Sequence, residues 1–528
     1  MKSILVVLSL VLLFSALDSF AASAQVPAKS ITGRYEGIAK SKLQGDVRVV
    51  LQIKFDGEKI VGVVNTPFGD FPIEGSYSSG QINIKFAAGD AKGIMALAVK
   101  TDSLSGTWSL SDDGGDINLK KTSAEVVVSE SAPTPEEPTS VPHLTSEQWR
   151  QDLRYLATEL AKRHKNAFHQ VSREQFEKAV NELDARIPTL KDYEIEIGLV
   201  RIGALIGDGH TYVNAWRTYH FFPLDVNWFG KDLRVTRAAS EYSRALGARI
   251  VRIEDKPLAE VKATLNQLIP QGETEGYALN ASAFFILSAE ALNTLGITKS
   301  LATARWTFAD DKGKQFTLDI TSVAQRYRDI KMLPAVTNQP LYLQRPKEEF
   351  WYTYLSDSQT VYLNFKAYPQ NFKEAVQGVL DFIDQHPTKR LVIDMRQNGG
   401  GDFTKVRVFL IPALKQRPTL NKRGHLFVIT GRDTFSAAMT NVVDLRKETE
   451  AILVGEPTGA RPNGYQEKRE LILPNSGLRV SYSAEYYKFQ ENDTPAVMPD
   501  KRIDLNWSVY KAGRDPVMEW IRSYHANR

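Results

Sequence analysis

The sequence contains no cysteine among its 528 residues. This absence excludes disulfides, thiolate metal sites, a cysteine nucleophile and a lipid-modified cysteine. Long hydrophobic runs are also lacking beyond the N-terminus, so we expect no integral membrane span in the mature protein. The net charge is only +4, from 66 Lys and Arg against 62 Asp and Glu. Because such a chain has no strong field to attract nucleic acid or anionic lipid, a peptidic or small partner is expected instead.

The single apolar run, residues 4–17, follows Lys2 and precedes Ala-Ser-Ala at residues 22–24. A basic residue, a short apolar stretch and small residues at a cleavage site are typical of a signal peptide. We therefore predict that residues 1–24 are a signal peptide and that the protein is exported. Export without cysteine favours a bacterial envelope, either the periplasm or the extracellular side.

The next three segments differ in their patterning. Residues 31–122 alternate apolar and polar positions in short runs between turn pairs, which predicts a small antiparallel β-barrel or sandwich. Residues 123–142 lack aromatics and are rich in Ser, Glu and Pro, a composition typical of a disordered linker. Residues 143–215 have helical periodicity, with capping boxes that begin at Thr145 and Ser172.

The remaining sequence divides into two regions. Residues 216–335 mix strands and helices, and the run at 247–258 is similar to the strand, turn and helix start of a PDZ-type module. In residues 340–528 strands and helices alternate, which predicts an α/β core with parallel strands. The expected fold class is therefore multidomain α+β, with a small N-terminal antiparallel β domain, a helical segment, a PDZ-like module and an α/β core.

Two loops of the α/β core carry candidate chemistry, because parallel sheets place reactive groups after the carboxyl ends of their strands. Ser436 follows one strand and precedes a predicted helix at 437–447. A helix N-terminus supplies free N–H groups where an oxyanion develops, although serine is also a common N-cap. The other loop holds three consecutive glycines, 399–401, which allow close approach of the main chain. Its N–H groups and that of Ala437 are candidate oxyanion donors, and a plain flexible turn is the alternative.

Three segments together resemble, in order and spacing, the catalytic domain of peptidase family S41, the tail-specific or C-terminal processing peptidases: residues 391–400, 434–438 and 454–459. The resemblance covers about residues 340–510 and leaves out the first 122. It implies a crotonase-like core in which Ser436 is the nucleophile. It also implies that Gly399 or Gly400 forms the oxyanion hole with Ala437.

The family activates its serine in two ways. One branch uses a lysine, and the matching position here is Arg461, which stays protonated and cannot act as a base. The tricorn-like and interphotoreceptor retinoid-binding-protein-like branch uses an upstream histidine, which His210 resembles in type and position. We therefore expect His210 to accept the proton of Ser436, with His220 and His425 as rivals.

The acid that orients the histidine is less clear from the sequence. Glu491 resembles the glutamate of the tricorn-like branch, and Asp208 is the local alternative. Either carboxylate also fits an exposed loop. A serine precedes the histidine in that branch, whereas Gly209 stands here, so the connection between acid and base must differ or use water.

The sequence thus predicts an exported serine endopeptidase that hydrolyses a peptide or protein substrate through an acyl-enzyme on Ser436. The alternative is a non-enzymatic carrier of a hydrophobic ligand on the same fold, because interphotoreceptor retinoid-binding modules resemble this family. A third hypothesis assigns the N-terminal β domain to glycan or envelope binding. No metal or cofactor motif is found in the sequence, so neither is expected.

Overall fold

The computed structural model describes residues 31–42, 45–56, 59–66, 69–88, 91–110, 113–123, 143–216, 219–324 and 330–525. The chain divides into two compact units, residues 1–134 and residues 135–528. The predicted signal peptide and all but the first residue of the predicted linker lie outside the described residues.

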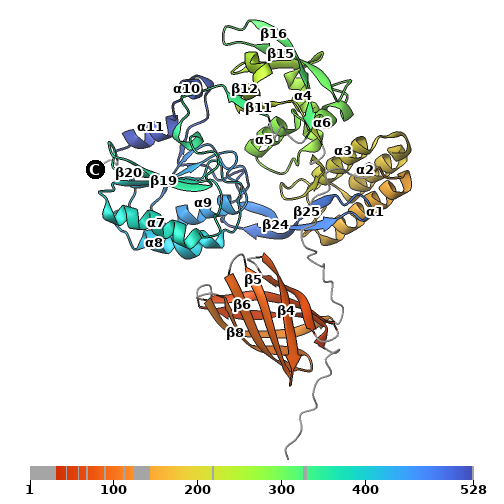
Figure 1. Cartoon of the computed structure of the whole chain (residues 1–528), viewed down its shortest axis with the longest axis vertical. Coiled ribbons are helices and arrows are strands. Elements are labelled where there is room, and N and C mark those ends of the chain that lie inside the picture. The colour runs from red at the N-terminus through yellow and green to blue at the C-terminus, as the bar shows by residue number, and fades with distance from the viewer. Residues whose placement is uncertain are drawn as a thin grey trace, which may run out of the picture. The chain divides into compact units, whose positions relative to one another are not determined.

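The N-terminal unit is a closed antiparallel barrel (Figure 1). Each strand pairs with the next, and β8 pairs back with β1. Alternate residues point inward, so that Leu51, Ile82 and Leu104 are fully buried. The expected antiparallel β domain is confirmed, as a barrel rather than a sandwich. Its strands are β1 (Gly33–Ser41), β2 (Gly45–Asp56), β3 (Lys59–Thr66), β4 (Gly69–Ser78), β5 (Gln81–Ala88), β6 (Ala91–Lys100), β7 (Ser103–Leu110) and β8 (Asp113–Ser123).

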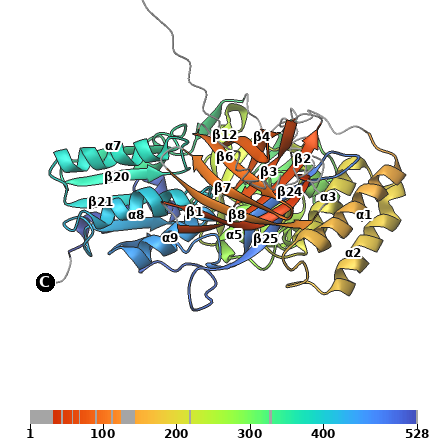
Figure 2. The same cartoon turned by 90° about the horizontal axis from the view of Figure 1, so that it is seen from below.

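The second unit begins with three helices that lie side by side (Figures 1 and 2): α1 (Ser146–Arg163), α2 (Arg173–Arg186) and α3 (Asp192–Ala204). The capping boxes at Thr145 and Ser172 are both present. The third helix ends shortly before the Gly-Asp-Gly-His run, whose histidine is followed by the short strand β9 (Tyr212–Asn214). The helical segment therefore leads directly into the loop of His210.

The mixed region contains an antiparallel sheet, in the order β11 (Leu224–Phe229), β12 (Asp232–Ala239), β13 (Arg249–Ile253), β15 (Thr303–Ala309) and β16 (Gln315–Thr321). Two short strands extend it, β14 (Lys256–Pro257) and β18 (Met332–Pro334), and β10 (His220–Phe221) pairs with β17 (Val323–Ala324). The helices of this region are α4 (Leu258–Leu265), α5 (Glu275–Phe285) and α6 (Ala289–Thr294). The residues just before α5 contact loops of the α/β core.

The α/β core has a six-stranded sheet in which all pairings except β19–β20 are parallel. The order is β19 (Phe350–Leu355), β20 (Thr360–Phe365), β21 (Arg390–Asp394), β22 (Leu426–Thr430), β23 (Ile452–Gly455) and β26 (Lys501–Arg502). Helices α7 (Phe372–Gln385), α8 (Ile411–Lys415) and α9 (Ala437–Glu448) cover one face. Helix α11 (Pro516–Ser523) covers the other. The predicted alternation of strands and helices is confirmed.

A long hairpin connects the α/β core to the helical segment. It consists of β24 (Asn463–Ile472) and β25 (Arg479–Lys488), and Figure 1 shows it reaching toward α1. The second hairpin strand pairs with β9, through Ser481 and Tyr212 among others. Because β9 follows His210 directly, this pairing holds the histidine loop against the core.

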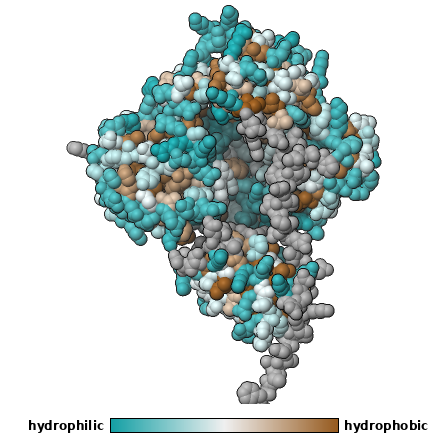
Figure 3. Space-filling view, in the orientation of Figure 1, coloured by the Kyte–Doolittle hydropathy of each residue, from teal (hydrophilic) through white to brown (hydrophobic). Residues whose placement is uncertain are grey.

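On the face shown in Figure 3, the described surface is largely hydrophilic. Large exposed apolar side chains are few and spread over both units: Ile38, Ile94, Ile472, Tyr486 and Met498. Within the described ranges, every helix is too short or too polar to cross a bilayer.

Candidate active site

Ser436 occupies the turn between β22 and α9. Its φ of 51° and ψ of −126° lie where residues other than glycine are rarely found. Although Ser436 is the N-cap residue of α9, its side chain makes no capping hydrogen bond with the described main chain. The hydroxyl instead lies 2.9 Å from Nε2 of His210. The strained turn therefore presents the hydroxyl to an imidazole rather than to its own helix.

His210 is buried, with 5% of its surface exposed, and its ring stacks on that of Phe435 at 4.8 Å. Burial lowers the pKa of His210 to about 4, while the carboxylate of Asp208 raises it and Lys468 lowers it. The imidazole is thus neutral near pH 7 and can accept a proton. The two rival histidines are His220 and His425. His220 contacts Glu290 at 2.8 Å, and among the described residues neither rival forms a hydrogen bond with the hydroxyl of Ser436.

The glycine loop lies directly against Ser436. Gly400 has a φ of 113°, and a Cβ added there would lie 2.7 Å from Cβ of Ser436 and 3.2 Å from N of Ala437. The N–H of Gly400 donates to Oδ1 of Asn398 at 3.0 Å. Because that bond occupies the Gly400 N–H, Gly399 and Ala437 are the better oxyanion donors among the three candidates.

Hydrogen bonds hold together the three segments that resemble the family, residues 391–400, 434–438 and 454–459. The hydroxyl of Thr434 donates to the carbonyl of Met395 at 2.8 Å and accepts from the N–H of Gly431 at 2.9 Å. The carbonyl of Thr434 accepts from the N–H of Gly459 at 2.9 Å. Asn398 adds a further contact, because its carbonyl accepts the N–H of Phe435 at 3.0 Å. The turn that carries Ser436 is therefore fixed from both sides.

A largely buried arginine, Arg396, supports the glycine loop. Arg396 forms ion pairs with Asp394 at 2.9 Å and with Asp515, at the start of α11, at 2.8 Å. The hydroxyl of Tyr362 donates to Asp394 at 2.7 Å. Burial raises the pKa of Asp394, and the guanidinium of Arg396 opposes that rise. Two carboxylates thus compensate one buried guanidinium and anchor the loop to α11.

The acid predicted from the family pattern is not brought to the histidine. Glu491 is exposed. The Nδ1 atom of His210 is buried and has no side-chain partner among the described residues, and the main chain of Tyr465 raises the pKa of the ring. Arg461, at the family's lysine position, pairs with Asp493 at 3.2 Å. Asp208, two residues before His210, accepts the main-chain N–H of His210 at 3.1 Å.

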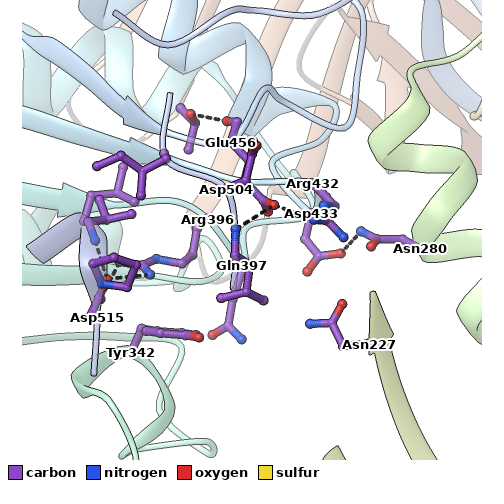
Figure 4. Close-up of a pocket in the computed structure, with 18 of the residues that line it drawn as sticks. Asn227, Asn280, Tyr342, Arg396, Gln397, Arg432, Asp433, Glu456, Asp504 and Asp515 are labelled. Carbon is purple, nitrogen blue, oxygen red and sulfur yellow. Dashed lines mark hydrogen bonds and ion pairs between the residues drawn. The ribbon is translucent and has the colours of Figure 1, made fainter. Parts of the chain in front are cut away.

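A pocket of about 100 Å³ is lined by residues of the loop that leads from β22 to Ser436 (Figure 4). The α/β core contributes Arg432 and Asp433, and the mixed region contributes Asn227 and Asn280. The amide of Asn280 donates to the carboxylate of Asp433. Arg432 forms an ion pair with Glu456 at 2.5 Å. The two regions therefore meet at this pocket through polar contacts.

Sequence reasoning missed three residues near His210. His164 and Ser483 bond to Asp208 at 2.8 and 2.6 Å. Oε1 of Glu273 accepts the N–H of Gly209 at 2.9 Å. Each comes from a segment far away in the chain and belongs to no motif, so no local pattern marks it.

Part of the chain matches a known family, and its fold matches solved structures. Residues 359–502 match the model of peptidase family S41, which confirms the resemblance inferred from the sequence motifs. Among solved structures, mature CPAF complexed with lactacystin is 12% identical with a TM-score of 0.52, and 71% of this chain covers 97% of that chain. Mature CPAF alone gives 12% identity, a TM-score of 0.50 and coverage of 71% and 96%. These two likenesses show a shared fold. No curated protein matches the sequence.

The glycine loop gives a first prediction. Gly400→Ala should reduce the labelling rate of Ser436 by a fluorophosphonate at least about 100-fold, because the new methyl group fills the space in front of the hydroxyl and the Ala437 N–H. The matched control is Gly378→Ala in α7, where no described atom lies within 4 Å of the added Cβ. The control should label normally and gain roughly 0.5–1 kcal/mol of stability. Undiminished labelling of Gly400→Ala would contradict the assignment.

The burial of His210 gives a second prediction, on pH. Protonation of Nε2 removes the lone pair that accepts the hydroxyl proton, so labelling of Ser436 should fall as the pH is lowered. Because burial lowers the pKa of His210 to about 4, the midpoint of this fall should lie near pH 4. An ordinary histidine would give a midpoint of about 6.5. Circular dichroism over the same pH range controls for unfolding, and a midpoint near 6.5 in folded protein would refute the prediction.

Proposed function

We propose that Ser436 is the nucleophile of a serine-type peptidase and that His210 is its general base, because residues 359–502 match the model of peptidase family S41. The observation that supports this most directly is the 2.9 Å contact between the Ser436 hydroxyl and Nε2 of His210. A nucleophile and a base within hydrogen-bond distance are the minimum that acyl transfer needs.

The proposed reaction begins when Nε2 of His210 accepts the proton of the Ser436 hydroxyl. The oxygen then attacks the carbonyl carbon of a peptide bond, and the negative charge moves to the carbonyl oxygen. The N–H of Ala437, at the N-terminus of α9, stabilises that charge together with the N–H of Gly399. His210 next donates its proton to the leaving amine, which leaves an ester on Ser436. Water hydrolyses this ester with the same histidine as base.

The finer features of the proposal come from the sequence. We propose that the protein is an exported endopeptidase, because residues 1–24 have the pattern of a signal peptide. The region 216–335 is proposed to act as a PDZ-like module that holds an extended peptide, and the α/β core to be crotonase-like. Glu491 stays outside the proposed mechanism, because its exposed position gives it no contact with His210 in the described part of the chain.

Substitution of the two central residues tests the proposal. Ser436→Ala and His210→Gln should each reduce cleavage of unfolded casein on the order of 10³-fold or more, because either change removes the activated nucleophile. His425→Gln is the matched control, since this rival histidine precedes the start of β22 whereas Ser436 follows its end, and it should cleave casein like the wild type. Thermal unfolding should show that all three variants remain folded.

Covalent labelling separates the peptidase from the carrier alternative. Wild-type protein should react with a fluorophosphonate, and peptide mapping by mass spectrometry should place the adduct on Ser436. Folded wild-type protein that stays unlabelled, leaves casein intact and binds a long-chain fatty acid would overturn the proposal in favour of the carrier.

A further inference from the structure

A buried cluster lies behind His210, centred on the carboxylate of Asp208. Oδ2 of Asp208 contacts Nε2 of His164 at 2.8 Å, and Oδ1 accepts the hydroxyl of Ser483 at 2.6 Å. The side chains of His164 and Asp208 are 0% and 5% exposed. His164 lies 44 residues before Asp208, and Ser483 lies 275 residues after it. Three distant segments therefore meet at one carboxylate.

The hydrogen bonds define the protonation states in this cluster. Nδ1 of His164 accepts the N–H of Asn166 at 2.9 Å, so in the neutral ring the proton is on Nε2 and is donated to Asp208. The Ser483 hydroxyl and the His210 N–H are the other donors to Asp208. Burial raises the pKa of Asp208, but the hydrogen bonds from His164 and Ser483, together with electrostatic interactions with His164 and His210, hold that pKa below its ordinary value. The carboxylate of Asp208 accepts three hydrogen bonds, and hydrogen bonds to the charged form favour ionisation. Asp208 is therefore an anion.

This anion is next to a base that must become positively charged. During the proposed reaction His210 carries an extra proton, and a buried cation without a nearby anion is costly. Its Nδ1 atom has no hydrogen-bond partner among the described side chains, so no acid contacts the ring directly. Asp208 raises the pKa of His210, which means that it favours the imidazolium through space.

Main-chain contacts hold the same three segments together. The N–H of Lys165 donates to the carbonyl of Ser483 at 3.0 Å. The N–H of Ser483 donates to the hydroxyl of Thr211, directly after His210, at 3.2 Å. These bonds join β25 to the end of α1 and to the loop that carries Asp208 and His210. The fold therefore sets the distance between the carboxylate of Asp208 and the ring of His210.

Other charged groups also face the histidine loop. Lys468 on β24 lowers the pKa of His210. Glu273, which precedes α5, accepts the N–H of Gly209, and burial raises its pKa to about 7. Asp208 is therefore the carboxylate here that is ionised well below neutral pH.

We propose that Asp208 is the anion that stabilises the imidazolium of His210, and that His164 and Ser483 are positioning residues that keep this carboxylate ionised and in place. The inference rests on the proposed function, because it assigns the acid of the same site. It gives the family's acid role to a residue two positions before the base, in place of the exposed Glu491.

The pH dependence of fluorophosphonate labelling in Asp208→Asn tests the first part. The plateau rate should fall on the order of 10- to 100-fold, because the developing imidazolium loses its counter-charge. The acid limb should also move to lower pH, because the remaining environment favours the neutral ring. A merely structural role would lower the plateau without moving the limb. Glu491→Gln should change neither quantity.

Matched variants test the positioning residues. His164→Phe keeps a buried ring but removes the donor to Asp208, whereas His164→Gln keeps an N–H donor at the same place. We expect His164→Phe to lower the plateau about tenfold or more and His164→Gln to recover most of the loss. Ser483→Ala should also lower the plateau rate of labelling. The control is Ser481→Ala, a buried serine two residues earlier on β25 whose hydroxyl does not bond to Asp208.

The outcomes distinguish this inference from the proposed function. Wild-type protein that fails to label would overturn both. Normal labelling of the wild type, with an unchanged plateau and acid limb in Asp208→Asn, would overturn the role of Asp208 alone. Equal losses in His164→Phe and His164→Gln would overturn the positioning role. Thermal unfolding reports whether each variant folds, and if Asp208→Asn does not fold, Ser483→Ala and His164→Gln decide the question.

Discussion

The hydrogen bond between Ser436 and His210 is the contact on which the rest of the site depends. It joins residues 226 positions apart at 2.9 Å, so small displacements of either segment would break it. The strained turn at Ser436 brings one partner into place. The pairing of β25 with β9 brings the other. Much of the second unit therefore serves to hold two side chains at one fixed distance.

Burial makes this contact useful and also makes it costly. A buried imidazole stays neutral at neutral pH, as a general base requires, but burial also disfavours the cation that forms when it accepts a proton. A nearby anion resolves this conflict. Asp208 can serve because His164 and Ser483 satisfy its oxygens with hydrogen bonds. The same principle holds under the glycine loop, where Arg396 is buried between two carboxylates.

Sequence patterns predicted the local features well. The capping boxes at Thr145 and Ser172, the antiparallel character of the N-terminal domain and the alternation in the α/β core are all confirmed. These features depend on residues close together in the chain, whose periodicity a sequence displays directly. The family motifs likewise lie in short segments, and the match over residues 359–502 confirms them. The pairing of β25 with β9 could not be predicted in this way, because the two strands lie far apart in the sequence.

By itself, the sequence determined which residue types stand in the reactive loops: a serine before a helix, a run of glycines after a strand, and a histidine after a Gly-Asp-Gly turn. Only the tertiary structure decided which of them meet. It placed Asp208 beside the base, left Glu491 exposed, and added His164 and Ser483 from segments without a motif. The physical reason is that hydrogen bonds and charge effects act over a few ångströms in space, whereas a sequence records only separation along the chain.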